Sequence, residues 1–228
     1  PVHIPLLDNT ASFLSGLSHM YERRGRGDVN IVAVAGDGAT ADCGFQSLSG
    51  AAERGEKILY VCYDNEGYMN TGYQRSSTTT EGSRTSTTPL GSALCGKQQP
   101  QKYIPLILAM HGVEYCATAT PWNMRDMVEK IEKGLAASKR GFAYLHVFSP
   151  CPTGWSFAPD QTIEVSKRAV KSNMFPLWEK SEGKYTLNYK NADPIPVADF
   201  VKGIGKFKKL SAEQLASIQR AADERYAT

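Results

Sequence analysis

The sequence lacks the features that mark membrane, secreted and nucleic-acid-binding proteins. No apolar run in its 228 residues approaches the roughly 20 residues that a membrane-spanning helix needs. The N-terminus has no basic region followed by an apolar stretch, so no signal peptide is recognisable. A formal net charge of +3 is too small to indicate nucleic-acid binding by itself. We therefore expect a cytoplasmic protein whose partners include no nucleic acid and no membrane.

Cysteine is also sparse and irregularly placed. The five cysteines form no CxxC pair and are odd in number, so they indicate neither a disulfide framework nor a complete zinc or iron–sulfur motif. We expect most of them to be buried structural thiols in a reducing compartment.

What the sequence does contain is a regular alternation of strands and helices. Apolar runs typical of strands buried on both faces of a parallel sheet lie at 29–35, 57–63, 113–119 and 141–148. Segments with helical spacing lie between them at 10–25, with Thr10 as N-cap, at 43–54, at 103–111 and after a cap at Asn123. The pattern predicts an α/β domain over residues 1–152, a parallel sheet with helices on both faces.

Two other segments depart from this alternation. Residues 73–96 are rich in serine, threonine and glycine, and such a long segment without hydrophobic period favours a functional loop over a passive connection. Beyond the domain, we expect a helix at 160–172, short polar strands within 183–200 and a final helix opened by a capping box at Ser211–Gln214. We interpret residues 153–228 as a C-terminal extension that packs on the domain or on partner subunits.

Two polar motifs follow the first two expected strands. Gly36-Asp37-Gly38 ends the first, and Asn65 and Gly67 follow the second. The carboxyl ends of parallel strands form the edge where ligands bind in open α/β sheets. The Asp37 carboxylate, the Asn65 amide oxygen and a carbonyl near Gly67 could therefore share one octahedral Mg²⁺, with water and phosphates completing its shell. Aspartate between glycines more often marks a turn, but the two motifs together predict an Mg²⁺-bound diphosphate.

The motifs resemble those of thiamine diphosphate enzymes, in which Gly-Asp-Gly is followed further along by an asparagine. The resemblance narrows to the thiamine-binding β subunit of 2-oxoacid:ferredoxin oxidoreductases, the pyruvate synthase family. It is carried by the segments GDGATADCGFQSLSGAAERG, YVCYDNEGYMNTGYQRS, TSTTPLG and SPCPTGW, and it extends over nearly the whole chain.

This resemblance implies a set of site residues. Asp37, Asn65 and the Gly67 carbonyl become the Mg²⁺ ligands. Asn70 becomes a catalytic residue beside the thiazolium and the 2-oxoacid, where its amide hydrogen-bonds a developing oxyanion. The alternative for Asn70 is a turn residue that bonds its own backbone. The implied cofactor-binding positions are Gly36, Asp37, Gly38, Asn65, Gly67, Tyr68, Asn70 and Thr71.

The resemblance also gives Cys151 a role as the last ligand of a [4Fe–4S] cluster, which needs four thiolates. In the family the other three ligands lie in upstream CxxC and Gly-Cys segments, and this sequence contains neither. Because the chain begins at Pro1 without a methionine, we expect it to be the later part of a longer polypeptide that supplies them; the alternative is that the cluster is absent. The remaining cysteines, expected to be structural, are Cys43, Cys62, Cys95 and Cys116.

The activity implied is oxidative decarboxylation of a 2-oxoacid, by default pyruvate to acetyl-CoA and CO₂. Thiamine diphosphate acts as the electron sink, and electrons leave through [4Fe–4S] clusters to ferredoxin. The implied partners are the other subunits of the enzyme, ferredoxin, the 2-oxoacid and coenzyme A. The glutamate that activates the cofactor comes from another subunit in this family, so Glu66 is not a candidate base.

Two alternatives remain open. Thr80 and Arg84 depart from the family pattern, and a cation near the substrate would favour a second carboxylate, as in oxalate or another dicarboxylic 2-oxoacid. The other interpretation of Arg84 is an ordinary solvated loop arginine or a subunit contact. A non-redox thiamine diphosphate decarboxylase or synthase would share the first two motifs without needing Cys151.

Overall fold

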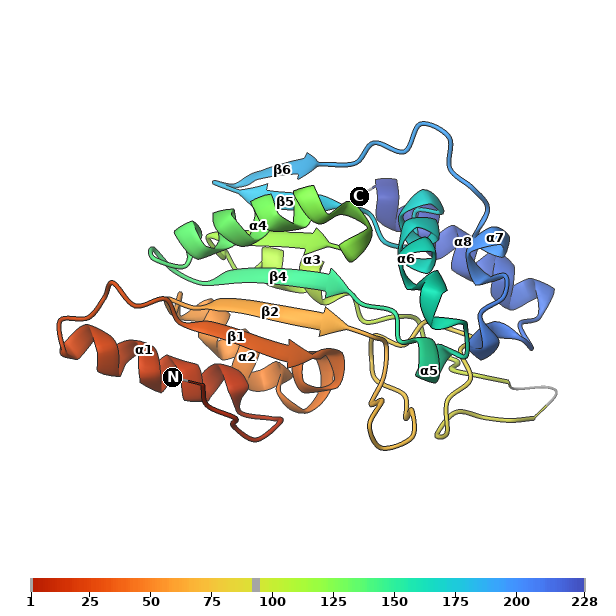
Figure 1. Ribbon diagram of the computed structural model, residues 1–228. Coiled ribbons are helices and arrows are strands. Elements are labelled where there is room, and N and C mark those ends of the chain that lie inside the picture. The colour runs from red at the N-terminus through yellow and green to blue at the C-terminus, as the bar shows by residue number, and fades with distance from the viewer. Residues whose placement is uncertain (1, 92–94, 228) are drawn as a thin grey trace.

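The computed structural model describes residues 2–91 and 95–227. Pro1 and residues 92–94 of the Ser/Thr-rich segment lie outside the described residues. In the described part, six strands form one sheet in the order β1-β2-β4-β3-β5-β6 (Figure 1). The strands are β1 Val32–Gly36, β2 Leu59–Asp64, β3 Tyr115–Ala119, β4 Ala143–Phe148, β5 Trp178–Ser181 and β6 Lys184–Leu187.

The expected parallel sheet is present in the first four strands. β1, β2, β4 and β3 are all parallel, whereas β5 pairs antiparallel with β3 and β6 antiparallel with β5. The sheet is therefore mixed. Its two antiparallel strands come from the residues that we expected to form an extension, and they form a hairpin that begins earlier than the expected 183–200.

Helices cover both faces of the sheet, as expected. On one face, α1 (Thr10–Arg23), α2 (Phe45–Glu53) and α3 (Ile104–Ala109) pack on the side chains of one hydrophobic cluster, and on the other face α4 (Met124–Ala137) covers a second cluster. The Asn123 side chain accepts a hydrogen bond from the Asp126 backbone N–H at 3.4 Å, which confirms the expected cap of α4. The cap of α1 is Asn9 and not Thr10.

The expectation that the first strand is buried on both faces is wrong. Val32 and Val34 of β1 remain 43% and 66% exposed, and the neighbouring Tyr63 of β2 is 44% exposed. These side chains are exposed because β1 is the edge strand of the sheet. The helix on their face, α4, packs against β2, β3 and β4 and does not cover β1.

The C-terminal helices lie at the carboxyl ends of β2 and β4 (Figure 1). They are α5 (Pro152–Trp155), α6 (Thr162–Lys171), α7 (Val197–Val201) and α8 (Ala212–Ala227), which pack around a third hydrophobic cluster. The capping box of α8 is confirmed by reciprocal 3.1 Å hydrogen bonds between Ser211 and Gln214. Single helical turns complete the fold at η1 Gly38–Cys43, η2 Pro121–Asn123, η3 Pro159–Gln161 and η4 Gly205–Phe207. No helix in the described ranges is both long and apolar enough to cross a membrane.

Candidate cation and cofactor site

Three oxygen-bearing groups predicted from the sequence meet at the carboxyl ends of β1 and β2. One atom of the Asn65 side-chain amide lies 3.0 Å from Asp37 Oδ1 and 2.8 Å from the Gly67 carbonyl oxygen. If this atom is nitrogen, the amide donates a hydrogen bond to each; if it is oxygen, three oxygens converge. Neighbouring ligands of an octahedral Mg²⁺ are about 2.9 Å apart, so the three groups fit such an ion in chemistry and in spacing.

Asp37 is buried in a position that disfavours its charge. Its Oδ2 accepts hydrogen bonds from the Ser76 hydroxyl and, at 3.0 Å, from the Thr78 hydroxyl. Burial, together with the nearby charge of Asp64, raises the pKa of the Asp37 carboxyl to about 8, and the two hydroxyls offset only part of this rise. A cation beside Asp37 would therefore supply the charge compensation that the surrounding protein does not.

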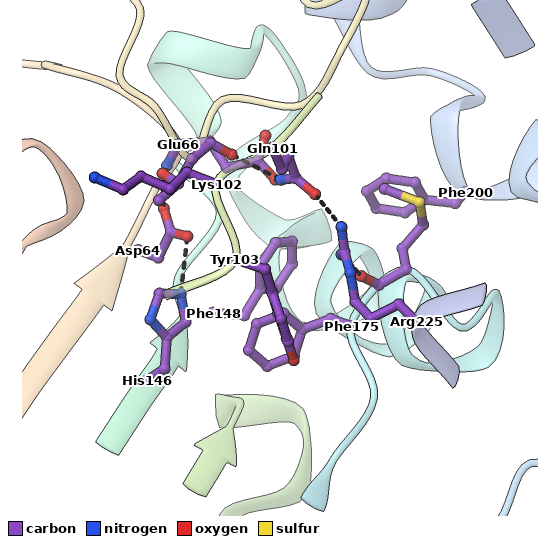
Figure 2. A pocket seen from close by; sticks show the side chains of 12 residues that line it. Asp64, Glu66, Gln101, Lys102, Tyr103, His146, Phe148, Phe175, Phe200 and Arg225 are labelled. Atoms are coloured by element: carbon purple, nitrogen blue, oxygen red, sulfur yellow. Dashed lines mark hydrogen bonds and ion pairs between the residues drawn. The ribbon is translucent and has the colours of Figure 1, made fainter. Parts of the chain in front are cut away.

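For Asp64, the last residue of β2, the surroundings favour the charged carboxylate. Burial raises its pKa, but the hydrogen bond to His146 Nε2 at 2.9 Å and the histidine charge outweigh this, so the pKa is below its usual range. Figure 2 shows this pair inside the fold. Thr78 donates a hydrogen bond to Asp64 at 2.9 Å or to Asp37, so it bridges the two carboxylates. Tyr144 completes the chain with a 2.7 Å hydrogen bond to His146 Nδ1.

The ring of Tyr68 leaves no room for a side chain at Gly38. A Cβ at Gly38 would lie 2.3 Å from the ring of Tyr68, whose hydroxyl donates to the Gly38 carbonyl at 3.2 Å. Gly36 has no atom within 3.7 Å of the position of a Cβ, so sterics alone do not demand a glycine there. Tyr68 thus ties the loop after β2 to the turn after β1.

The Ser/Thr run at 76–80 supplies hydrogen bonds to four acidic side chains, and sequence reasoning missed these pairings. Ser76 and Thr78 reach Asp37, and Ser77 reaches Asp42 through its N–H and its hydroxyl. The Thr80 N–H and hydroxyl donate to Glu66 at 2.9 and 2.7 Å. Five consecutive hydroxyl residues are the signal that could have suggested a loop that satisfies buried carboxylates.

Glu66, between the two loop ligands, is buried and paired. Lys206 Nζ lies 2.7 Å from its Oε2, and the Gln101 amide donates to its Oε1 at 3.3 Å. Burial lowers the pKa of Lys206, and the Glu66 charge offsets only part of that change. Figure 2 shows Gln101 between Glu66 and Arg225 of α8. The cavity among these side chains has about 20 Å³ of free space, enough for one water molecule but not for a cofactor.

Cys151 is partly exposed at the end of β4, next to the loop that carries Asn65. Its sulfur accepts a hydrogen bond from the Gly154 N–H at 3.4 Å at the start of α5, and the Trp155 indole N–H donates to the Asn65 carbonyl at 2.8 Å. Within residues 2–91 and 95–227, no three His, Cys, Asp or Glu side chains group together as a metal site. An iron–sulfur cluster at Cys151 would therefore need thiolates from outside the described residues.

The burial of three of the other four cysteines confirms the expectation that most of the cysteines are buried. Cys62, Cys95 and Cys116 are buried, but Cys43, in the turn after Asp37, is exposed.

Asn70 and Thr71 lie in the exposed turn of a short hairpin, which is closed by backbone hydrogen bonds between Tyr68 and Gln74. Among the described residues, the Asn70 side chain makes no hydrogen bond, so no bond to its own backbone occupies its amide. Thr71 bonds the Gln74 side chain. No hydrogen bond in the described part joins Asn70 to Asp37 or Asn65.

Comparisons with known proteins identify the chain as similar to thiamine diphosphate-binding enzymes. Residues 9–147 match the family model of the thiamine pyrophosphate enzyme, C-terminal TPP binding domain. The NADH-dependent phenylglyoxylate dehydrogenase subunit beta of Aromatoleum evansii is 50% identical, over 98% of this chain and 50% of its own length. Pyruvate synthase subunit PorB of Methanothermobacter marburgensis is 45% identical, over 97% of this chain and 76% of its own. The chain thus spans half of one relative and about three quarters of the other.

The fold is also that of a solved enzyme, the 2-oxoglutarate:ferredoxin oxidoreductase from Magnetococcus marinus with 2-oxoglutarate, coenzyme A and succinyl-CoA bound. The TM-score is 0.56 at 20% identity, over 93% of this chain and 74% of that one. The fold alone does not identify the family, but the family model and the sequence identities do. The chain belongs to the family of thiamine diphosphate-binding β subunits of 2-oxoacid:ferredoxin oxidoreductases.

Proposed function

We propose that this chain is the thiamine diphosphate- and Mg²⁺-binding part of an enzyme that oxidatively decarboxylates a 2-oxoacid. Pyruvate is the default substrate, with acetyl-CoA and CO₂ as products, and the electrons pass through [4Fe–4S] clusters to ferredoxin. The observation that carries the proposal is the convergence of Asp37, Asn65 and Gly67 at the sheet edge of a chain from this family.

In this proposal each site residue has a defined task. Asp37, Asn65 and the Gly67 carbonyl would hold Mg²⁺, which binds the diphosphate. Bound thiamine diphosphate supplies an electron sink for loss of CO₂. Asn70 is exposed and its amide makes no hydrogen bond to the described residues, so it would donate one to the oxygen where negative charge develops. The further cofactor-binding positions that we propose are Gly36, Gly38, Tyr68 and Thr71.

Cys151 would be one thiolate ligand of a [4Fe–4S] cluster, with the other three supplied from outside this chain. Other subunits of the same enzyme, ferredoxin and coenzyme A complete the proposed partners; the two curated relatives are themselves named as subunits. Reduced cysteines and an iron–sulfur ligand are consistent with a cytoplasmic location.

A separate question is which 2-oxoacid is the substrate. Relatives are named for phenylglyoxylate, pyruvate and ketoisovalerate. A dicarboxylic substrate such as oxalate is the second candidate, and one observation favours it: the Arg84 guanidinium has no hydrogen-bond or ion-pair partner in the described ranges, although its Nε is buried. An arginine in that state can still bind a carboxylate.

Replacing Arg84 with alanine separates the two candidates. If Arg84 binds a second carboxylate, Arg84→Ala lowers kcat/KM for oxalate roughly tenfold or more relative to pyruvate, because a charge-assisted contact is lost. Arg75→Ala, in the same loop but exposed, is the matched control. An unchanged oxalate-to-pyruvate ratio would leave pyruvate as the substrate.

The overall function is tested on the assembled enzyme. We expect 2-oxoacid-dependent reduction of ferredoxin that requires added thiamine diphosphate and Mg²⁺. NAD⁺ is assayed alongside, because one relative is named as NADH-dependent. Decarboxylation by an enzyme free of iron, with neither acceptor reduced, would instead identify a non-redox thiamine enzyme.

A further inference from the structure

The ion pair between Glu66 and Lys206 joins the loop after β2 to the C-terminal part of the chain. The two side chains are 3% and 0% exposed, and the distance from Lys206 Nζ to Glu66 Oε2 is 2.7 Å. Nζ also lies 3.1 Å from the centroid of the Trp155 ring. A fully buried ion pair adds little stability compared with well-packed apolar side chains, so its presence suggests a role other than stability.

Asn65 and Gly67, which precede and follow Glu66 in the chain, are the proposed cation ligands. Lys206 contacts Glu66 itself and the Trp155 ring, which is hydrogen-bonded to Asn65. The Trp155 ring under Nζ donates its indole N–H to the carbonyl of Asn65. On the other side, the Glu66 backbone has a φ of +60°, an uncommon conformation for a residue other than glycine. That conformation sets the direction in which the chain continues to Gly67.

A second connection reaches Glu66 from α8. The Gln101 amide donates to Glu66, and the Arg225 guanidinium donates to the Gln101 side-chain oxygen at 3.0 Å (Figure 2). The backbone of Glu66 is fixed as well, since its N–H donates to Asp64 and its carbonyl accepts from Thr79, both at 2.8 Å. Glu66 is thus the point where the C-terminal residues and the Ser/Thr loop meet.

We propose that Lys206 is a positioning residue: through Glu66 and Trp155 it holds Asn65 and Gly67 in the arrangement that binds the cation. The inference rests on the proposed function, because it takes these groups as Mg²⁺ ligands. Residues that orient metal ligands without touching the metal commonly change metal affinity roughly 10–100-fold when mutated.

The test uses the assembled enzyme and measures Mg²⁺ affinity by calorimetric titration in the presence of thiamine diphosphate, with the melting temperature as a second readout. The variants are Lys206→Met, Glu66→Gln and the double variant Glu66→Gln/Lys206→Met. Lys206→Met leaves Glu66 unpaired and should unfold most easily. The double variant leaves no unpaired buried charge, so it should stay folded while its Kd for Mg²⁺ rises roughly 10–100-fold.

Lys130 offers a matched control, because it is also buried and ion-paired but lies on α4. Its Nζ is 2.8 Å from Asp126, and the side chains are 1% and 13% exposed. Asp126→Asn/Lys130→Met should leave the Kd for Mg²⁺ unchanged. An unchanged Kd in a folded Glu66→Gln/Lys206→Met variant would overturn the role of Lys206. Failure of the wild-type enzyme to bind Mg²⁺ and thiamine diphosphate would instead overturn the proposed function.

Discussion

Asp37 and Asp64 are two buried carboxylates joined by one threonine hydroxyl, and their surroundings push their pKa values apart. His146 stabilises the charge on Asp64, whereas the pKa of Asp37 is raised by its burial and by the charge of Asp64, and the hydrogen bonds from Ser76 and Thr78 offset only part of this rise. Without a cation, the negative charge therefore belongs on Asp64 and the proton on Asp37. A group in this state releases its proton when a cation binds.

Because the Asp37 carboxyl is protonated at neutral pH in the absence of a cation, Mg²⁺ affinity should increase with pH. Below the Asp37 pKa of about 8, the proton competes with the cation, so the affinity should fall about tenfold per pH unit. In the metal-free protein, the folded-state pKa lies above the unfolded value, so the stability from this group is lost as the pH rises through about 8. Calorimetry in buffers of different ionisation enthalpy measures the released proton. A pH-independent affinity with no proton release would contradict the assignment.

At the scale of elements, periodicity located the four parallel strands and the longer helices within a few residues, and it identified the caps at Asn123 and Ser211. It missed the short helices α5 and α7 and the start of β5. It could not show that β1 is an edge strand, because an apolar run contains no information about which neighbours cover it. Nor could it show that the Ser/Thr-rich segment folds back over the sheet edge. That segment has no hydrophobic period, and its position depends on hydrogen bonds to acidic residues far away in the sequence.

The role of this segment predicts that Thr78→Val is destabilising although valine has nearly the same shape. The change removes the only hydroxyl that contacts both Asp37 and Asp64 in the described residues, and lost donors to buried charged groups cost roughly 1–3 kcal/mol. Urea denaturation measures the free energy of unfolding. Thr186→Val, at an exposed position of β6, serves as the control and should change it little. Equal effects in the two variants would show that the Thr78 hydroxyl does not support the carboxylates.

At the scale of the whole molecule, the sequence was sufficient to predict that Asp37 and Asn65 lie together, since the ends of neighbouring parallel strands meet at one sheet edge. It was not sufficient to predict the partners that surround them. Lys206 and Glu66 are 140 positions apart, and His146 and Asp64 are 82 apart, so only the folded chain brings each pair together. The C-terminal residues, which were expected to pack on the domain or on partner subunits, contribute directly to the loop of the candidate site.

Cys151 can be tested only in the assembled enzyme, because the structure offers it no further ligands in the described ranges. Cys151→Ser should lower the iron content and alter the paramagnetic resonance signal of the cluster, while decarboxylation without electron transfer persists. Serine oxygen is a poorer ligand than thiolate for iron–sulfur clusters. Cys116→Ser, at a buried cysteine within β3, is the control for effects on folding alone. Normal iron content in the Cys151 variant would make Cys151 a structural residue.

Asp37 is proposed to hold the cation that binds thiamine diphosphate. The most direct test is calorimetric titration of thiamine diphosphate, with Mg²⁺ present, into the wild-type assembled enzyme and into Asp37→Ala. We predict that the variant keeps its fold, since the change removes a buried carboxylate that Asp64 repels, and that Mg²⁺-dependent binding is lost. Asp28→Ala, at an exposed position, should bind as the wild type does. Unchanged affinity in Asp37→Ala would show that Asp37 is not a ligand of the cation.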